Sequence, residues 1–541
     1  MQALAALLDD LAFAPGEAGQ IARIGRYLAA VPDPDRGWGL AVLAGALELP
    51  AIGPAALRRL AEARLDPVLF ALSHDFVGDL AETLALLWPD RPGTAPPPGP
   101  EAAIAALAAT PRAARSDLVA AWLDGAARPA RVTLLKLLTG GARAAISGRL
   151  ARRAFAAWSG QDLAAIDALW HGLVPPYTAL FAWAYGRAPR PDPATGPLFH
   201  PLLRADKIED ATIGALDPAT HRAEWKWDGI RVRLVATPSG CRVFSGDADD
   251  ISASFPEIAA VLDFDAVLDG ELLALTEAPG PRGESLPPPA PVAVLQRRLD
   301  RRTPAAAAIR AVPVGVRLYD ILFEAGEDLR PLPFDARRAR LESWFARTRP
   351  AAMDLSPLLA FATPANLAAL RDAGRAPGSE GLMLKRRDSP YVAGPSRGAW
   401  WKWQHDPCRI NAVLMYAEPG PGPRGGTASQ VTFGVWQGET LVPVGKAQIG
   451  EGVGGEVSGG GIGPEGAWLD RWIGAHTIAR FGPVREVEKA LVLEIAFDSA
   501  ALAPRRKAGI ALRSPRIARL RPEKPAAAAD RLDALRARLA I

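Results

Sequence analysis

An abrupt change in residue pattern near residue 190 most constrains the fold of this chain. Up to about residue 185 the sequence is rich in Ala and Leu, and segments such as ALRRLAEARLDPVLFALS place apolar residues at i, i+3, i+4 and i+7, the spacing of an amphipathic helix. The Pro- and Gly-dense stretch 185–197 then forbids regular structure. Short β-like runs such as RVRLVAT and AVLDGELLAL follow, with helical stretches between them, up to about residue 404. The chain therefore combines an all-helical block with an α+β block.

A third pattern begins near residue 405. Strand-like runs such as RINAVLMYAE and QVTFGVWQG follow one another with Gly-rich connectors and little helix, which predicts a small β-barrel. A chain of 541 residues is also too long for a single core. We therefore predict a multidomain protein with an all-α domain over 1–190, an α+β domain over 198–404 and a β-barrel domain over 405–541.

Composition narrows the compartment and excludes some chemistry. The two cysteines, Cys241 and Cys408, are far apart in sequence, so a disulfide framework and a four-cysteine zinc site are both excluded. The N-terminus lacks a basic leader, and no apolar run is long enough to span a bilayer. We expect a cytoplasmic monomer without a membrane partner. A net charge of +4 is compatible with a nucleic-acid partner but does not demonstrate one.

Lysine is rare in this chain, and one lysine stands in a distinctive segment. Of the 63 basic residues nine are lysines. A lysine in this background therefore suggests a chemical role, such as that of an amine, which a guanidinium group cannot take. Lys226 lies in EWKWDGIR (224–231), where EWKW and IRVRLVA predict strands and Asp228-Gly229 predicts the turn between them. Burial and neighbouring cations favour the neutral, nucleophilic form of a lysine, and Arg231 can hold a phosphate or ribose oxygen. The alternative interpretation is an ordinary hairpin with an exposed lysine.

This segment is similar to the nucleotidyl-transfer motif of ATP-dependent DNA ligases, which are related to RNA ligases and mRNA capping enzymes. Other segments resemble further motifs of the family in the family's order: LDGELLAL (268–275), VRLYDILFEAGEDLR (316–330), EGLMLKRRDSPYVAG (380–394) and WWKWQ (400–404). Each segment alone is typical of a core strand, but the ordered set argues against that interpretation. The resemblance covers almost the whole chain and indicates the larger bacterial type with an N-terminal helical DNA-binding domain.

The resemblance implies a role for each motif residue. Lys226 is the catalytic nucleophile, which takes AMP from ATP. The side chains expected around the nucleotide are Glu224, Arg231, Glu271, Tyr319, Arg397 and Lys402. The Tyr319 ring would stack on adenine, and Lys402 and Arg231 would neutralise the α-phosphate. Glu271 and Glu380 are expected to hold Mg²⁺ (or Mn²⁺).

The two flanking regions also resemble parts of these ligases. DFVGDLAETLALL (75–87) and LLKLLTGGARAAIS (134–147) resemble segments of the helical domain that grips the duplex backbone. Lys136 and Arg143 are candidate DNA contacts, and solvated helix charges are an equal alternative. The C-terminal region resembles an OB-fold with a basic motif, in which Arg521 and Lys524 would position the pyrophosphate leaving group.

Three positions depart from the family pattern. Gly246 and Gln404 stand where the family usually has cations, and Glu523 stands where Asp is usual. Arg397 lies one residue out of register with another usual arginine. The first two departures remove positive charge near the phosphates, so restoring it should speed adenylation unless another arginine compensates. An alternative for Gly246 is a left-handed turn that only glycine adopts easily.

The resemblance implies a three-step reaction on nicked double-stranded DNA. AMP would pass from ATP to Lys226, then to the 5′-phosphate of a nick, and the 3′-hydroxyl would finally displace it. NAD-dependent ligases are disfavoured because two cysteines cannot build their zinc module. The remaining alternatives are an RNA ligase or capping-type nucleotidyltransferase, against which the helical block argues, and a nick-binding protein with weak ligase activity.

Overall fold

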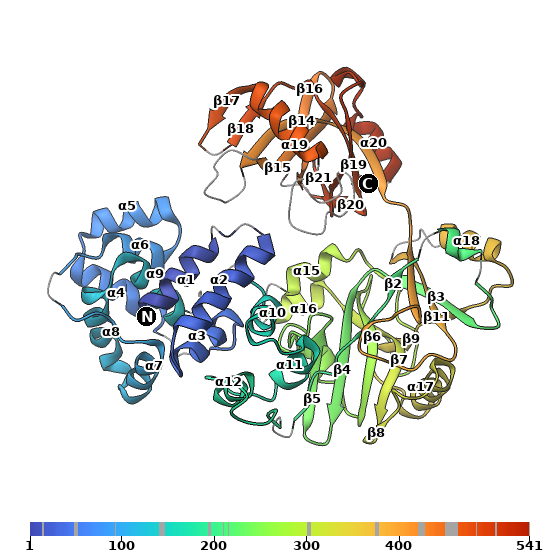
Figure 1. Ribbon diagram of the computed structural model, residues 1–541, viewed down its shortest axis with the longest axis horizontal. Coiled ribbons are helices and arrows are strands. Elements are labelled where there is room, and N and C mark those ends of the chain that lie inside the picture. The colour runs from blue at the N-terminus through green and yellow to red at the C-terminus, as the bar shows by residue number, and fades with distance from the viewer. Residues whose placement is uncertain are drawn as a thin grey trace. The chain divides into compact units, whose positions relative to one another are not determined.

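The structure is a computed structural model (Figure 1). It describes all residues except 13, 15, 48–51, 92–93, 140–145, 193–195, 209, 215, 300–303, 374–377, 420–427, 450–463, 483, 504–505 and 540–541. The chain forms two compact units, one of residues 1–364 and 383–402 and the other of residues 365–382 and 403–541. None of the described helices combines the length and the apolar character that a membrane span requires.

The first unit begins with a helical region, as the periodicity predicts. Its elements are α1 (Gln2–Ala12), α2 (Gly16–Ala30), α3 (Asp35–Leu43), α4 (Pro54–Arg64), α5 (Pro67–Val77), α6 (Leu80–Leu87), α7 (Pro100–Ala109), the 3₁₀ turn Arg112–Ala114, α8 (Arg115–Gly125), α9 (Arg128–Leu138), α10 (Gly148–Ser159), α11 (Leu163–Trp170) and α12 (Thr178–Ala184). These helices form two apolar cores, one around Leu84 and Leu135 and one around Phe155 and Phe181.

The segment 75–87 forms two helices because its sequence contains both a stop and a start signal. Gly78 ends α5 in the left-handed region at φ 75°, where glycine has no steric penalty. The Asp79 side chain then accepts a hydrogen bond from the Glu82 backbone N–H at 2.8 Å and caps α6.

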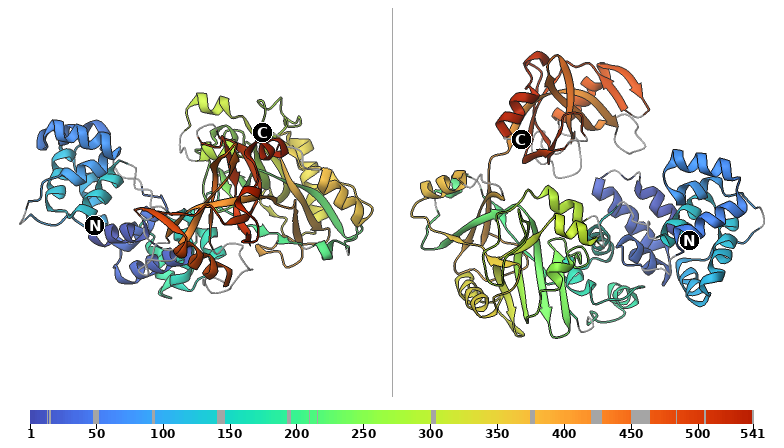
Figure 2. Two further views of the ribbon diagram at one scale, coloured as in Figure 1. Left: turned by 90° about the horizontal axis from the view of Figure 1, so that it is seen from above. Right: turned by 180° about the vertical axis from the view of Figure 1, so that it is seen from behind.

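Two sheets form the rest of the first unit. The strands are β1 (Leu203–Arg204), β2 (Asp206–Lys207), β3 (His221–Trp227), β4 (Ile230–Thr237), β5 (Gly240–Ser245), β6 (Ala266–Ala274), β7 (Val314–Glu324), β8 (Glu327–Asp328), β9 (Met353–Leu355), β10 (Leu358–Leu359), β11 (Ser379–Arg386), β12 (Gly394–Pro395) and β13 (Trp400–Gln404). The helices among them are α13 (Asp210–Ile213), α14 (Pro256–Ala259), α15 (Ala293–Leu299), α16 (Ala306–Ala311) and α17 (Phe334–Thr348). Residues 365–382, which include nearly all of α18 (Pro364–Ala373) and the first half of β11, and the last two residues of β13 are counted with the second unit. One sheet has the order β10-β3-β11-β13-β2 and the other β5-β4-β6-β7-β8, with β9 beside β7. Helix α17 packs against β7 (Figures 1 and 2).

The strands on either side of Asp228-Gly229 belong to different sheets. β3 lies in the first sheet and β4 in the second, so the alternative of an ordinary hairpin is wrong. Glycine is needed at the crossing because a Cβ on Gly229 would approach the Leu272 carbonyl oxygen to 2.5 Å. The turn therefore carries the chain from one sheet to the other, past the strand that bears Glu271.

The helical region is joined to the second sheet at the loop after β5. From α10, the buried Arg152 donates to the Asp247 carbonyl and pairs with Asp249 at 3.3 Å. From the end of α11, the His171 ring nitrogen lies 2.6 Å from the Ala248 carbonyl oxygen. Ala248 itself has a φ of 63°, so the left-handed residue of this loop is Ala248. Gly246 does not have a positive φ, and the left-handed turn considered for it is wrong.

The second unit is mainly antiparallel sheet. Its elements are β14 (Cys408–Pro419), β15 (Ala428–Gln437), β16 (Thr440–Gln448), α19 (Pro464–Ala475), β17 (Thr477–Phe481), β18 (Val484–Val487), β19 (Val492–Phe497), β20 (Ser499–Leu502), β21 (Ile510–Arg513), β22 (Arg516–Arg521), the 3₁₀ turn Ala526–Ala528 and α20 (Leu532–Leu539). β14 pairs with β15, with β18 near one end and with β19 near the other, as in a strongly curved sheet. Its core includes Leu414, Phe433 and Ile495.

Candidate active site

A pocket of about 310 Å³ lies between the two sheets of the first unit. Its lining residues are Arg204, Ala205, Glu224, Trp225, Lys226, Trp227, Arg231, Glu271, Tyr319, Met383, Lys385, Trp400 and Lys402. Strands far apart in sequence thus bring together six residues expected at the nucleotide on sequence grounds: Lys226, Glu224, Arg231, Glu271, Tyr319 and Lys402.

Lys226 lies near the end of β3, and the next residue anchors that end of the strand. The Trp227 indole N–H donates to the Ser356 hydroxyl at 3.1 Å. The Arg317 guanidinium lies 4.2 Å from the centroid of the Trp227 ring, a cation–π contact. Because Trp227 is held on both its edge and its face, the backbone that carries Lys226 has a defined position at the pocket.

Arg231 is held by protein partners. Its Nη2 pairs with Asp269 at 2.6 Å, its Nε contacts the same carboxylate at 3.2 Å, and its Nη1 donates to the Leu203 carbonyl at 2.8 Å. Burial opposes the charge on Asp269, but Arg231 and Arg233 outweigh it and lower the pKa of that carboxyl to about 2. The three nitrogens of Arg231 are therefore all engaged, which leaves this side chain little capacity to bind a ligand phosphate.

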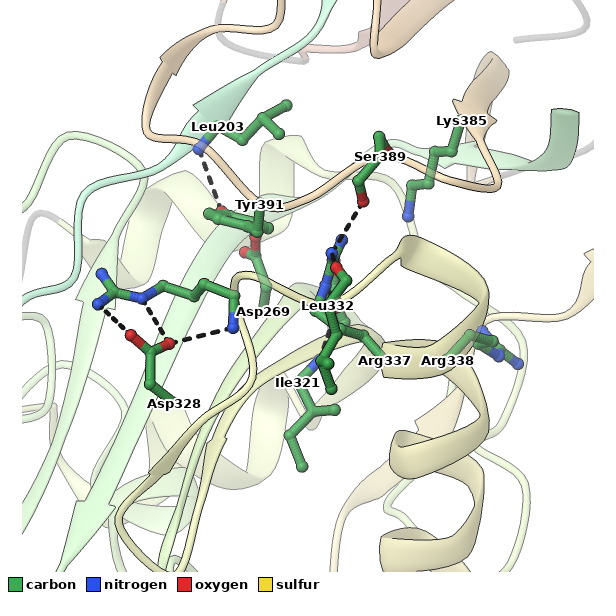
Figure 3. Close-up of polar contacts among 12 residues, drawn as sticks. Leu203, Asp269, Ile321, Asp328, Leu332, Arg337, Arg338, Lys385, Ser389 and Tyr391 are labelled. Carbon is green, nitrogen blue, oxygen red and sulfur yellow. Dashed lines mark hydrogen bonds and ion pairs between the residues drawn. The ribbon is translucent and has the colours of Figure 1, made fainter. Parts of the chain in front are cut away.

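Tyr391 completes the hydrogen-bond network around Arg231, and Figure 3 shows it beside Leu203 and Asp269. Its hydroxyl donates to Asp269 at 2.8 Å and accepts from the Leu203 backbone N–H at 3.1 Å. Arg233, which is also buried, donates to the same hydroxyl at 2.6 Å. The phenol thus ties the strand leading into the pocket to β6, and burial together with Asp269 raises its pKa to about 12 despite the nearby arginines.

A second buried ion pair forms another part of the wall. Lys385 Nζ lies 2.7 Å from Glu224 Oε2, and both side chains are almost fully buried. Burial lowers the pKa of Lys385, and Glu224 opposes that shift. The ammonium also lies 4.2 Å from the Trp400 ring centroid and 4.7 Å from that of Tyr319. The Lys385 ammonium therefore contacts two of the aromatic rings of the pocket, Trp400 and Tyr319.

The candidate metal ligands are separated by the division into units. Glu271 lines the pocket, whereas Glu380 belongs to the second unit, where it accepts from Gln404 at 3.3 Å and pairs with Arg513 at 3.4 Å. Within the described ranges, no group of three or more His, Cys, Asp or Glu side chains could hold a metal ion. A single carboxylate still fits Mg²⁺, which keeps several waters and binds substrate phosphates.

Two further expected residues are not part of the pocket wall. Arg397 is exposed, with a φ of 49°, and does not line the pocket. Gln404 is also exposed, and its amide donates to Glu380. Sequence register alone placed both near the nucleotide, but β13 begins only at Trp400 and puts Trp400 and Lys402 on the pocket wall.

The candidate contacts outside the central domain are partly paired. Lys136, in the last turn of α9, forms an ion pair with Glu82 of α6. Arg143 lies outside the described residues. In the second unit Arg521 pairs with Glu494 at 3.1 Å and with Glu523 at 2.5 Å, so one departure from the family pattern binds directly to a candidate residue. Lys524 follows in the turn after β22.

Sequence reasoning missed the residues that hold the site together. Asp269 and Arg233 are opposite each other on β6 and β4, as are Glu271 and Arg231. The signal was present, since charges at alternate positions of otherwise apolar strands indicate cross-strand ion pairs. Arg204 was also missed, and its sequence surroundings carry no comparable signal, because it reaches the pocket from a two-residue strand.

Comparison with known proteins supports the family to which the motifs point. The family model described as ATP dependent DNA ligase domain matches residues 203–404. The chain is 31% identical to a "Probable DNA ligase" of Koribacter versatilis (strain Ellin345), over 78% of this chain and 74% of the relative. It is also 31% identical to a "Probable DNA ligase" of Anaeromyxobacter sp. (strain Fw109-5), over 98% of this chain and 96% of the relative.

A solved structure described as mycobacterial DNA ligase D complexed with ATP and MES is similar at 22% identity, over 61% of this chain and 97% of that chain, with a TM-score of 0.32. Family membership rests on the two sequence relatives. The chain belongs to the ATP-dependent DNA ligases, enzymes that use ATP to join DNA.

Proposed function

We propose that this chain seals nicks in duplex DNA through an AMP group carried on Lys226. The observation that supports the proposal most directly is the composition of one pocket wall. Lys226 lines the same 310 Å³ pocket as Lys402, Glu271 and Tyr319. These residues are an amine nucleophile, a cation for phosphate oxygens, a carboxylate for a divalent metal and an aromatic ring for the base.

The reaction has three phosphoryl transfers. In the first, Lys226 Nζ attacks the α-phosphorus of ATP, a P–N bond forms, the amine loses a proton to solvent and pyrophosphate leaves. In the second, an oxygen of the 5′-phosphate at the nick attacks the AMP phosphorus, and the lysine amine leaves and takes up a proton from solvent. In the third, the 3′-hydroxyl attacks the 5′-phosphorus, loses its proton and releases AMP. The protein contributes mainly position and charge to these steps.

Each pocket residue has a task in this scheme. Lys402 neutralises the oxygens of the phosphate under attack. Tyr319, held by Lys385 and by its hydroxyl bond to Asp269 at 3.3 Å, provides the ring against the adenine. Glu271 and Glu380 are the carboxylates assigned as ligands for Mg²⁺ or Mn²⁺. When bound, the metal neutralises phosphate charge.

The flanking regions serve the DNA. We propose residues 1–190 as a duplex-binding domain, 198–404 as the adenylation domain and 405–541 as an OB-fold domain of a monomeric enzyme. Lys136 is one backbone contact, which requires that it exchange Glu82 for a phosphate. Arg521 and Lys524 act on the pyrophosphate of the first step. Arg397, exposed and away from the pocket wall, is left without a nucleotide role in this scheme.

The test uses the full chain with labelled ATP, Mg²⁺ and a duplex that contains one nick. We expect a labelled protein that loses its label when nicked DNA is added, together with a sealed strand. Peptide mapping by mass spectrometry should place AMP on Lys226. Binding of the nick without label would favour the weak-ligase alternative, and sealing of nicked RNA in preference to DNA would favour the RNA-ligase alternative.

A further inference from the structure

A second cavity of about 590 Å³ lies beside the nucleotide pocket in the first unit. Its lining residues are Arg149, Leu202, Arg204, Gly229, Ile230, Arg231, Ser245, Gly246, Asp247, Asp249, Ile251 and Leu299. Arg204 and Arg231 line both cavities. These two arginines therefore form the wall between the nucleotide pocket and this second cavity, which we call the Arg204 cleft.

The two arginines of the shared wall differ in how many hydrogen bonds they make within the protein. Every guanidinium nitrogen of Arg231 bonds to Asp269, Leu203 or Tyr391. Arg204 is exposed, and across the described part of the chain its guanidinium has no hydrogen bond or ion pair. A planar guanidinium with five donors can bind phosphate oxygens on two sides. Of the two side chains that face both cavities, Arg204 is the one with donors to offer.

The carboxylates of the Arg204 cleft form ion pairs with arginines other than Arg204. The cleft contains two carboxylates, but Asp247 pairs with Arg149 and Asp249 pairs with Arg152. Burial and repulsion by Arg149 lower the pKa of Arg204, although Asp247 and Asp167 oppose the shift. An anionic ligand would relieve that repulsion.

Gly246 leaves the cleft open. A Cβ at this position would meet only the Arg231 Cβ, the Arg231 carbonyl oxygen and a Leu202 methyl group, all at 3.7 Å. This is ordinary van der Waals contact, so the backbone would accept a side chain there. Because no side chain is present, the space beside Arg204 stays available to a ligand.

We propose that Arg204 is a catalytic residue that binds the phosphate groups between which AMP is transferred, the AMP phosphate in the nucleotide pocket and the DNA 5′-phosphate in the Arg204 cleft. The inference rests on the proposed function. During the transfer the new P–O bond forms while the P–N bond to Lys226 breaks, and the lysine amine takes up a proton from solvent. Arg204 stabilises the negative charge on both phosphates at that point. It thereby supplies the charge that Gly246 lacks.

The test follows AMP through its separate steps in the full chain. Wild type, Arg204→Ala and Arg204→Lys are labelled with ATP, and single-turnover transfer of AMP to a nicked duplex is measured for each. Arg310→Ala is the matched control, because Arg310 is an exposed arginine of α16 outside both cavities. We expect Arg204→Ala to slow the transfer by about 10²-fold, Arg204→Lys to recover part of the rate as a point charge, and all melting temperatures to agree. Transfer by Arg204→Ala at the rate of Arg310→Ala would overturn the proposal.

A double variant tests whether the defect of Arg204→Ala comes from the loss of positive charge in the cleft. Gly246→Arg places a guanidinium in the same cleft and should raise the transfer rate of Arg204→Ala. A defect that Gly246→Arg leaves unchanged would refute the assignment of this charge to the cleft. Failure of the proposed function would look different, because wild type itself would then form no labelled adduct.

Discussion

The nucleotide pocket and the junction after β5 lie in the same compact unit, yet they use charge in different ways. In the pocket, Asp269 has a fully buried side chain and serves two arginines, and Lys385 and Glu224 are 1% and 2% exposed. At the junction burial is mixed: Arg152 is 2% exposed, whereas Arg149 is 30% and Asp247 is 56% exposed.

This difference in burial separates two kinds of interaction. A buried pair fixes geometry, and removing one partner strands the other charge in a low-dielectric environment. An exposed pair is worth little by itself and can exchange partners. Single substitutions in the pocket should therefore cause large losses of stability, whereas the exposed Arg149–Asp247 pair should be able to exchange its partners for a ligand.

The largest expected effect is at the proposed nucleophile. Lys226→Arg should abolish the covalent AMP adduct, because a guanidinium cannot form the required phosphoramidate. Labelling with ATP measures it, with Lys207→Arg as the control, since Lys207 is an exposed lysine outside the pocket. A labelled Lys226→Arg protein would remove Lys226 from its proposed role.

Next in size is the buried network under Arg231. Asp269→Ala leaves Arg231 and Arg233 without their shared carboxylate and should reduce the free energy of unfolding by about 3–5 kcal/mol. Asp328→Ala breaks the exposed pair with Arg330 and should cost less than about 1 kcal/mol. Urea denaturation of both variants measures the contrast. Equal losses would mean that burial does not distinguish these pairs.

Substitution of the candidate metal ligands should slow the reaction without unfolding the protein. Glu271→Ala and Glu380→Ala should each slow nick sealing by about 10²-fold or more, as for other preorganised charge contacts. Sealing rates at several Mg²⁺ concentrations, with melting temperatures as the control for folding, provide the measurement. Near-normal sealing by both variants would show that neither carboxylate acts in the reaction.

As the pH falls, we expect the protein to lose stability first through His171 at the junction and only later through Asp269 in the pocket. Burial lowers the pKa of His171 to about 4, although the Ala248 carbonyl opposes the shift. The unfolded chain therefore binds this proton first, and stability falls as pH drops from about 6.5 towards 4. The loss reaches about 2 kcal/mol at pH 5. Asp269, with a pKa lowered to about 2, contributes stability that is lost only below about pH 4.

Unfolding of wild type and His171→Gln at pH 7 and pH 5 measures this effect. The difference between the two proteins isolates His171, because His200, whose pKa burial lowers to about 3, is present in both. A variant with the same pH dependence as wild type would contradict the assignment.

The smallest effect is expected at Gln404. Its family position suggested that Gln404→Lys would speed adenylation, but the side chain is exposed and donates to Glu380. We expect less than about a tenfold change in the single-turnover rate of adenylate formation. A larger gain would place Gln404 at the nucleotide in the working enzyme, and Lys446→Gln, in β16 of the same unit, serves as the control for altered charge.

Much of the fold and most of the pocket could be predicted from local pattern. The structure contains the predicted helical region and the strands on both sides of Asp228-Gly229, and Lys226 and Glu271 line one pocket. Three positions lie differently from what the motif pattern suggested, and the reason is the same for each. Arg397 and Gln404 were placed by register in a motif, and Gly246 by its residue type, but the direction of a side chain depends on the strand or loop that carries it.

The sequence by itself determined the chemistry and the local elements: the amine of Lys226 in the motif EWKWDGIR, helices from a period of 3.6 residues and strands from alternation. Only the tertiary structure decided which charges are available. The Arg231 guanidinium donates to Asp269, 38 residues away, and to Tyr391, 160 residues away. The Arg204 side chain instead lines the cleft, where it can bind a ligand. Periodicity is a property of neighbouring residues, whereas a buried charge takes its partner from whatever strand the packing brings beside it.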